Sequence, residues 1–284
     1  MNTNLPHLDV ASILRQHGLR ADKKLGQNFL QDPAALERIV AAAEIGADDP
    51  VLEIGPGLGS LTRHLAVRAT TVTAIELDQA LIPILESVLA PFPNVRIIQG
   101  DILKFPPASL VDQDDYLVVA NVPYYITSAI FRHLLASPPR PRRIVLTVQK
   151  EVAERVCAEP GDMSLLALSV QVYGRPTIAA SIPAEAFHPA PKVDSAVIRV
   201  DLYPEPVVPP AALGQFFRLA KAGFSQKRKT LRNSLSAGLA ISPEAASQLL
   251  NRAEIDPQRR AETLSLEEWG SLCRIQGSAP IIVA

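Results

Sequence analysis

The chain has few cysteines, almost no net charge and no long apolar run. Its 284 residues include two cysteines, Cys157 and Cys273, which are far apart and not in the spacing of metal ligands. We therefore expect no disulfide scaffold and no metal site, and a reducing compartment, the cytoplasm. No apolar stretch approaches the roughly 18 residues of a membrane-spanning helix. The first thirty residues also lack the basic start and apolar run of a signal peptide, so we expect no membrane partner.

The balance of charges excludes a strongly basic or strongly acidic protein. The formal net charge is -1, and 48% of the residues are apolar, so a sizeable core can form. A nucleic-acid partner is still compatible with this charge, because a local basic patch is sufficient for phosphate contacts.

Short apolar runs alternate with helical patterns in the first part of the chain. Five runs that are each followed by a helical segment predict parallel strands: 51–54, 72–76, 95–101, 116–120 and 144–149. Two further runs, 177–182 and 196–202, have no helix between them and predict an antiparallel edge. The pattern indicates an α/β fold with a doubly wound, Rossmann-like sheet.

A proline-rich linker, Tyr203-Pro-Glu-Pro-Val-Val-Pro-Pro, follows the last predicted strand. Beyond it the periodicity is helical throughout, with helices predicted over 211–223, 229–239, 243–252 and 265–276. We expect two domains, 1–203 with the sheet and 204–284 as a small all-helical domain.

The segment Gly55-Pro-Gly-Leu-Gly lies between a predicted strand and a predicted helix. Glycines there let a ligand approach the backbone closely. A dinucleotide fingerprint needs Gly or Ala at position 60, where this chain has Ser60. The spacing therefore favours S-adenosylmethionine over a nicotinamide cofactor, and the alternative is a tight turn without a ligand.

Two carboxylates follow the next two predicted strands. Glu76 is placed to accept both ribose hydroxyls of a nucleoside, whereas Asp78 is expected to cap the following helix. Asp101 is placed to accept from an adenine amino group, and its alternative role is in a turn.

The segment Asn121-Val-Pro-Tyr-Tyr-Ile ends a buried strand with an amide, a proline and two aromatic residues. The Asn121 side chain and the Pro123 carbonyl are predicted to accept both N–H bonds of an adenine amine, while Tyr124 stacks on the base. Catalysis would then depend on positioning and dipoles, without a strong general base. The alternative is an Asn-Pro turn with tyrosines in the core, and core packing is the role expected for Tyr125. Phe187, in a loop expected to be rigid and exposed, is a second stacking candidate.

Basic residues gather in two places. The segment 225–232 contains Lys227, Arg228, Lys229 and Arg232, which we expect to bind RNA phosphates. The alternative is a solvated helix face. A second group, at positions 20, 23 and 24, precedes the segment 25–30.

Several motifs together resemble the ribosomal RNA adenine N6-dimethyltransferases. They are Leu25-Gly-Gln-Asn-Phe-Leu, Glu53-Ile-Gly-Pro-Gly-Leu-Gly, Ile75-Glu-Leu-Asp, Asn121-Val-Pro-Tyr-Tyr-Ile, Val148-Gln-Lys-Glu-Val-Ala-Glu-Arg, Phe187-His-Pro-Ala-Pro-Lys-Val-Asp-Ser and Phe224-Ser-Gln-Lys-Arg-Lys-Thr-Leu-Arg-Asn. The resemblance extends from about residue 20 to 272 and implies a seven-stranded S-adenosylmethionine methyltransferase sheet with a small helical domain. It also implies cofactor contacts at Asn28, Leu30, Gly55, Glu76, Asp101 and Asn121.

Within that family the chain is most similar to the bacterial small-subunit enzymes. This implies dimethylation of two adjacent adenines in the 3′-terminal hairpin of 16S rRNA, on the precursor of the 30S subunit. We expect the protein to be a monomer, although the sequence itself does not reveal the oligomeric state. Two alternatives remain: the related 23S rRNA methyltransferases of macrolide resistance, and a non-catalytic ribosome-assembly factor that kept the fold. Val122 and Gly59 differ mildly from the residues expected in the family.

Overall fold

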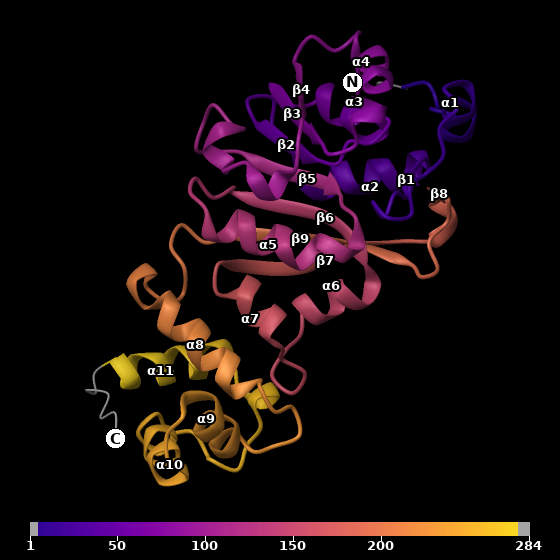
Figure 1. Ribbon diagram of the computed structural model, residues 1–284. Coiled ribbons are helices and arrows are strands. Elements are labelled where there is room, and N and C mark those ends of the chain that lie inside the picture. The colour runs from indigo at the N-terminus through magenta and orange to yellow at the C-terminus, as the bar shows by residue number, and fades with distance from the viewer. Residues whose placement is uncertain (1–4, 278–284) are drawn as a thin grey trace. The chain divides into compact units, whose positions relative to one another are not determined.

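The computed structural model describes residues 5–277 (Figure 1). The chain divides into two compact units, one formed by the residues up to Ala153 with Pro176–Leu202, the other by Glu154–Arg175 with the residues from Tyr203 on. The predicted division after residue 203 did not anticipate that Glu154–Arg175 belongs with the helical unit. That residues 1–203 and 204–284 form two separate domains stays a prediction.

A seven-stranded mixed sheet is the centre of the first unit. Its strands are β2 (Pro50–Ile54), β3 (Thr71–Glu76), β4 (Val95–Gln99), β5 (Leu117–Asn121), β6 (Arg143–Gln149), β7 (Gly174–Ile182) and β9 (Ser195–Leu202). They lie in the order β4-β3-β2-β5-β6-β9-β7, with β2 to β6 parallel and β9 antiparallel to β6. The predicted α/β fold and its seven strands are confirmed.

The order of the strands determines where a ligand can bind. From β2 the chain continues outward through β3 and β4, and then returns to form β5 on the other side of β2. Loops therefore leave the carboxyl ends of β2 and β5 in opposite directions, and such a switch point opens a crevice.

Helices flank this sheet (Figure 1). They are α1 (Val10–Gln16), α2 (Pro33–Ala43), α3 (Ser60–Ala66), α4 (Ile82–Leu89), α5 (Thr127–Ala136) and the start of α6 (Lys150–Val156). The predicted start of α2 is confirmed, because Asp32 accepts a hydrogen bond from the Ala35 amide and Pro33 takes the first helical position. The apolar face of α2 joins residues of β2 and β5 in one buried cluster.

A two-stranded sheet ties distant parts of the chain together. Strand β1 (Phe29–Leu30) pairs antiparallel with β8 (Phe187–His188). Both strands are two residues long, too short for hydrophobic periodicity to reveal them. Their pairing holds the segment 25–30 beside the carboxyl ends of the main sheet.

The second unit is helical apart from the first residues of β7. Its helices are α7 (Leu165–Gln171), α8 (Leu213–Gly223), α9 (Leu231–Leu239), α10 (Pro243–Arg252) and α11 (Leu266–Gly277). A Cβ at Gly223 would lie 2.4 Å from the Trp269 ring and one at Gly238 would lie 2.6 Å from Ala222, so both glycines permit close helix packing. Among the described residues, no helix is long and apolar enough to cross a membrane.

Candidate active site

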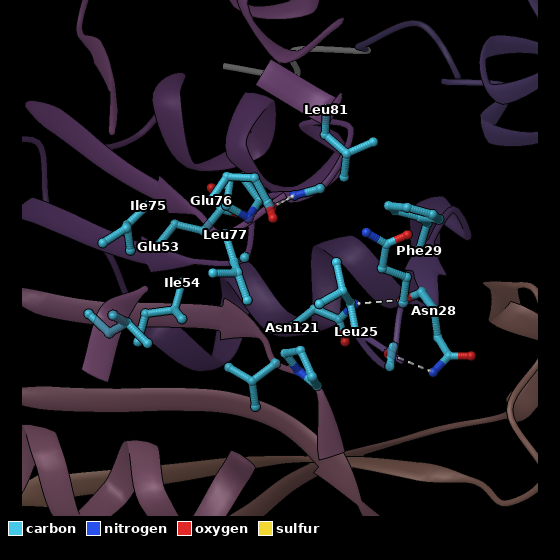
Figure 2. Close-up of a pocket in the computed structure, with 18 of the residues that line it drawn as sticks. Leu25, Asn28, Phe29, Glu53, Ile54, Ile75, Glu76, Leu77, Leu81 and Asn121 are labelled. Carbon is cyan, nitrogen blue, oxygen red and sulfur yellow. Dashed lines mark hydrogen bonds between the residues drawn. The ribbon is translucent and has the colours of Figure 1, made fainter. Parts of the chain in front are cut away.

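A pocket lies at the carboxyl ends of β2, β3 and β5 (Figure 2). Its empty volume is about 980 Å³, part of which is open to solvent. It is lined by residues of five segments, 25–30, 53–58, 75–77, 100–102 and 121–126, and by Ser60, Leu61 and Leu81. These segments contain every cofactor contact that the sequence predicted, together with Pro123 and Tyr124.

The glycines of the loop after β2 are required by its geometry. Gly55 and Gly57 have φ values of +68° and +59°, in the left-handed region that side chains disfavour. A Cβ at Gly57 would also lie 2.9 Å from Cδ1 of Phe29. The backbone and the Phe29 ring therefore form a close-fitting wall of the pocket.

Glu76 is buried at the end of β3, with an exposed fraction of 6%. Its Oε2 accepts from the Gly57 amide at 2.9 Å and its Oε1 from the Asp78 amide at 2.8 Å. Burial raises the pKa of this carboxyl group, and the two amides oppose that rise. A carboxylate oxygen accepts more than one hydrogen bond, so both oxygens can still receive ligand hydroxyls.

Asp78 caps the following helix, as the sequence predicted. Its Oδ1 accepts from the Ala80 amide, which caps a short helix, and its Oδ2 accepts from Gln27 at 2.7 Å. Asp101 caps the turn Ile102–Lys104 through Oδ1, which accepts from the Leu103 amide at 3.0 Å. Its Oδ2 has no hydrogen bond within the described chain, so Asp101 combines the role in a turn with a free acceptor in the pocket.

Asn121 is held in a defined orientation. Its Nδ2 donates to the carbonyl of Asn28 at 3.1 Å (Figure 2), which leaves Oδ1 as an acceptor. The Pro123 carbonyl accepts from the Ile126 amide at 3.2 Å and has a second lone pair. Both residues line the pocket and keep an oxygen lone pair available as an acceptor.

The two tyrosines that follow differ in their surroundings. Tyr124 is half-buried, and burial raises the pKa of its phenol. Its hydroxyl lies 2.6 Å from Oγ of Ser195, and this hydrogen bond fixes the position of the ring. Tyr125 is 61% exposed. The expected core packing of Tyr125 is therefore wrong.

The expected exposed loop at Phe187 is also wrong. Phe187 is 2% exposed because β8 pairs with β1 and its ring joins the buried cluster beneath the sheet. It does not line the pocket. To stack on a base, the Phe187 ring would have to leave this core. Its predicted role as a second stacking surface for the base is therefore not supported by its position.

Glu53 is a pocket residue that the sequence-based site did not include. It lies in β2 with an exposed fraction of 1%, and its Oε2 has no hydrogen-bond partner in the described part of the chain. Burial raises its pKa to about 8, and the nearby Glu76 adds to that rise. The available signal was an acid inside an otherwise apolar strand, Val51-Leu-Glu-Ile.

The donor set fits a cationic ligand without phosphates. The acidic residues that line the pocket are Glu53, Glu76 and Asp101; Lys, Arg and His are absent from the described lining. A pyrophosphate would meet like charge here, whereas a sulfonium and an ammonium group would be attracted. Apolar side chains such as Ile54, Leu77 and Ile102 supply walls for a flat base. S-adenosylmethionine has all of these groups, and a nicotinamide dinucleotide does not match.

The RNA-binding candidates lie in the second unit. Lys227, Arg228 and Lys229 are exposed, but they lie in the loop between α8 and α9 and not on the predicted helix over 229–239, which begins at Leu231. Arg232 is half-buried on α9 and donates to the Asn233 side chain at 3.2 Å. The first three cations are therefore solvated in a loop and not on a helix face, and their binding to RNA phosphates stays a prediction. Among residues 5–277, no group of three or more His, Cys, Asp or Glu side chains is placed to hold a metal ion.

Comparison with known proteins identifies the family. The family model for ribosomal RNA adenine dimethylase matches residues 18–276. This chain belongs to the ribosomal RNA adenine dimethylase family. It is an enzyme, and its cofactor is S-adenosylmethionine. Membership of this family argues against the alternative of a non-catalytic ribosome-assembly factor.

The relatives of this dimethylase show which branch it is similar to. It is 46% identical over 269 residues to the ribosomal RNA small subunit methyltransferase A of Dehalococcoides mccartyi, covering 94% of this chain and 92% of the relative. The protein of the same name from Bacillus mycoides is 43% identical over 270 residues, with 92% of each covered.

Solved structures share the fold. The 23S rRNA methyltransferase ErmE has a TM-score of 0.71 and 29% identity, over 88% of this chain and all of that one. A dimethyladenosine transferase from Plasmodium falciparum has a TM-score of 0.72 and 25% identity, over 86% and 95%. The higher identity to the small-subunit enzymes favours the main prediction over the 23S alternative.

Proposed function

We propose that this protein dimethylates the N6 amines of two adjacent adenines in the 3′-terminal hairpin of 16S rRNA, on a precursor of the 30S subunit. It acts as a monomer in the cytoplasm. The orientation of Asn121 carries the proposal, because its Oδ1 and the Pro123 carbonyl form an acceptor pair suited to an amine. The names of the relatives in Dehalococcoides mccartyi and Bacillus mycoides support small-subunit rRNA as the substrate.

S-adenosylmethionine supplies an activated methyl group when it is bound. Glu76 would hold its ribose hydroxyls as an acceptor, and Asp101 would accept from its adenine amino group. Glu53 lies in the same pocket, where the positive charge of the ligand would favour the ionised form of its carboxyl group. Asn28 and Leu30, with Gly55, form the surrounding wall.

The target amine is a poor nucleophile, because its lone pair is delocalised into the adenine ring. Two acceptors, at Asn121 and Pro123, hold its N–H bonds and favour a more tetrahedral nitrogen, whose lone pair is then available. The described segment 121–126 contains no strong general base, so the lost proton passes to solvent. Catalysis depends on positioning and fixed dipoles.

Tyr124 holds the base itself. Unstacking a base costs a few kcal/mol, and stacking on an aromatic ring returns about 1–3 kcal/mol. Because the Tyr124 hydroxyl is bonded to Ser195, its ring is already oriented before the base arrives. The cations Lys227, Arg228, Lys229 and Arg232 bind RNA phosphates and supply affinity without sequence preference.

The test is methyl transfer by an Asn121→Ala variant. Tritiated methyl groups are followed from S-adenosylmethionine to unmethylated 30S and 50S subunits, and the modified base is mapped. We expect the wild type to label adenines of the 30S hairpin, and Asn121→Ala to lose transfer while it still binds the particle. Asn251→Ala, an amide on α10 that is exposed, is the matched control. Full transfer by Asn121→Ala, or labelling of 50S in place of 30S, would contradict the proposal.

A further inference from the structure

Tyr125 is the most exposed of the large apolar and aromatic side chains among the described residues. Its exposed fraction of 61% compares with 36% for Tyr203, the other exposed tyrosine. Tyr125 also lines the pocket, directly after the segment that holds the target amine. An aromatic ring left in water at the mouth of an active site has apolar area available for a ligand.

The position of this ring is defined by its neighbours. A Cβ at Gly26 would lie 3.1 Å from Cε1 and 3.2 Å from Cδ1 of Tyr125, so the ring packs closely against the glycine. Gly26 has a φ of +65°, which disfavours a larger residue there. The Tyr125 hydroxyl has no hydrogen bond within the described chain, so the ring itself is the part that is held.

Hydrogen bonds of the Gln27 side chain hold the loop that contains Gly26 in place. Gln27 accepts from the Asp22 amide at 2.8 Å through its side chain, and it donates to Asp78 at 2.7 Å. Two exposed cations, Lys23 and Lys24, lie in this loop and form no ion pair with any described residue. A flat aromatic ring thus packs against a loop that carries two exposed cations, and aromatic rings with cations are the combination that binds a base with its phosphate.

We propose that Tyr125 is a stacking platform for the RNA base next to the target adenine, with Lys23 and Lys24 at the phosphates of that nucleotide. The target base cannot occupy both rings, since Tyr124 is the tyrosine anchored by Ser195 beside the acceptor pair. When the target base leaves its stack, its neighbour loses a stacking partner, and Tyr125 replaces it. The inference rests on the proposed function and adds a second nucleotide to the recognition site.

The test compares Tyr125→Phe, Tyr125→Leu and Tyr125→Ala. Initial rates of methylation are measured at varied concentrations of unmethylated 30S subunits, and S-adenosylmethionine affinity is measured by calorimetry. Since base stacking is worth about 1–3 kcal/mol and 1.4 kcal/mol is tenfold, we expect Leu and Ala to lower kcat/KM for the particle about tenfold or more. Phe should rescue the value, because it keeps the ring. Affinity for S-adenosylmethionine should stay unchanged in all three variants.

Tyr203→Ala, which removes the other exposed tyrosine, is the matched control and should behave like the wild type. Wild-type kcat/KM in Tyr125→Leu overturns the inference, as does a loss in Tyr125→Phe equal to that in Tyr125→Ala. A loss confined to S-adenosylmethionine affinity also overturns it, because Tyr125 would then belong to the cofactor pocket. Failure of the proposed function is distinct: the wild type itself would not methylate 30S subunits.

Discussion

Replacing Glu53 by Gln removes an acid that the fold holds in an unfavourable place. Glu53 is fully enclosed in β2, and its Oε2 has no hydrogen-bond partner in the described part of the chain. Burial raises its pKa from 4.5 to about 8. Gln has nearly the same shape and carries no charge, so the substitution removes the titration while the packing is kept.

The sign of the effect follows from proton linkage. The folded protein holds a proton on Glu53 up to about pH 8, whereas the unfolded chain releases it near pH 4.5. The stabilisation by this group is therefore fully present below pH 4.5 and is lost as the pH rises through about 8. At up to 1.36 kcal/mol per pH unit, and less near the two pKa values, the free energy of unfolding falls by about 3–4 kcal/mol between pH 5 and pH 8. The Glu53→Gln variant does not have this loss.

Hydrogen exchange measures the effect in the unit that contains Glu53. Opening free energies are obtained at pH 5, 6, 7 and 8 for peptides from β2 and β3, after correction for the intrinsic exchange rate at each pH. Peptides from α8 and α11 report the second unit, and Glu86→Gln, on the exposed side of α4, is the control for removing one carboxylate. The reasoning is refuted if the wild type and Glu53→Gln lose opening free energy equally between pH 5 and pH 8.

Two further predictions concern the RNA-binding loop and the glycine loop. Replacing Lys227, Arg228 and Lys229 by Gln should weaken binding to 30S subunits and reduce the dependence of log affinity on log salt concentration, both measured by filter binding. Arg15→Gln is the control. An unchanged affinity at low salt would refute the role of the three cations in binding phosphates. Gly57→Ala should lower the stability measured by thermal unfolding by about 1–3 kcal/mol, because the φ of Gly57 is +59° and the new Cβ would meet Phe29. The control is Gly18→Ala, which has a φ of +65° but open space around its Cβ and should cost less. Equal costs for the two variants would show that the contact with Phe29 does not destabilise the protein.

The sheet strands were predictable because their signal is local. Runs such as Val72-Thr-Ala-Ile-Glu and Tyr116-Leu-Val-Val-Ala record burial on both faces of a parallel sheet, and the helical segments between them dictate the crossovers. The ligand position followed from the same pattern, because parallel strands place their carboxyl ends at one edge. Asn121, Glu76 and Asp101 therefore meet in one pocket, as predicted.

Exposure of individual side chains was not predictable in the same way. Phe187 and Tyr125 were assigned in reverse: the first is 2% exposed and the second 61%. An aromatic residue beside prolines or glycines has no periodic partner that reveals which side of it is covered. The pairing of β8 with β1 covers Phe187, and the packing of Tyr125 against Gly26 leaves its ring open.

The sequence by itself determined the fold class, the family and the set of acceptor groups at the sheet edge, because strand patterns and motif residues are local properties. Only the tertiary structure decided the state of those groups. It buried Glu53 with Oε2 lacking a hydrogen-bond partner among the described residues, fixed Asn121 through the Asn28 carbonyl, and placed Lys227, Arg228 and Lys229 in a loop. The physical reason is that burial, hydrogen-bond orientation and exposure depend on segments as far apart as β1 and β8, whose contact no local pattern encodes.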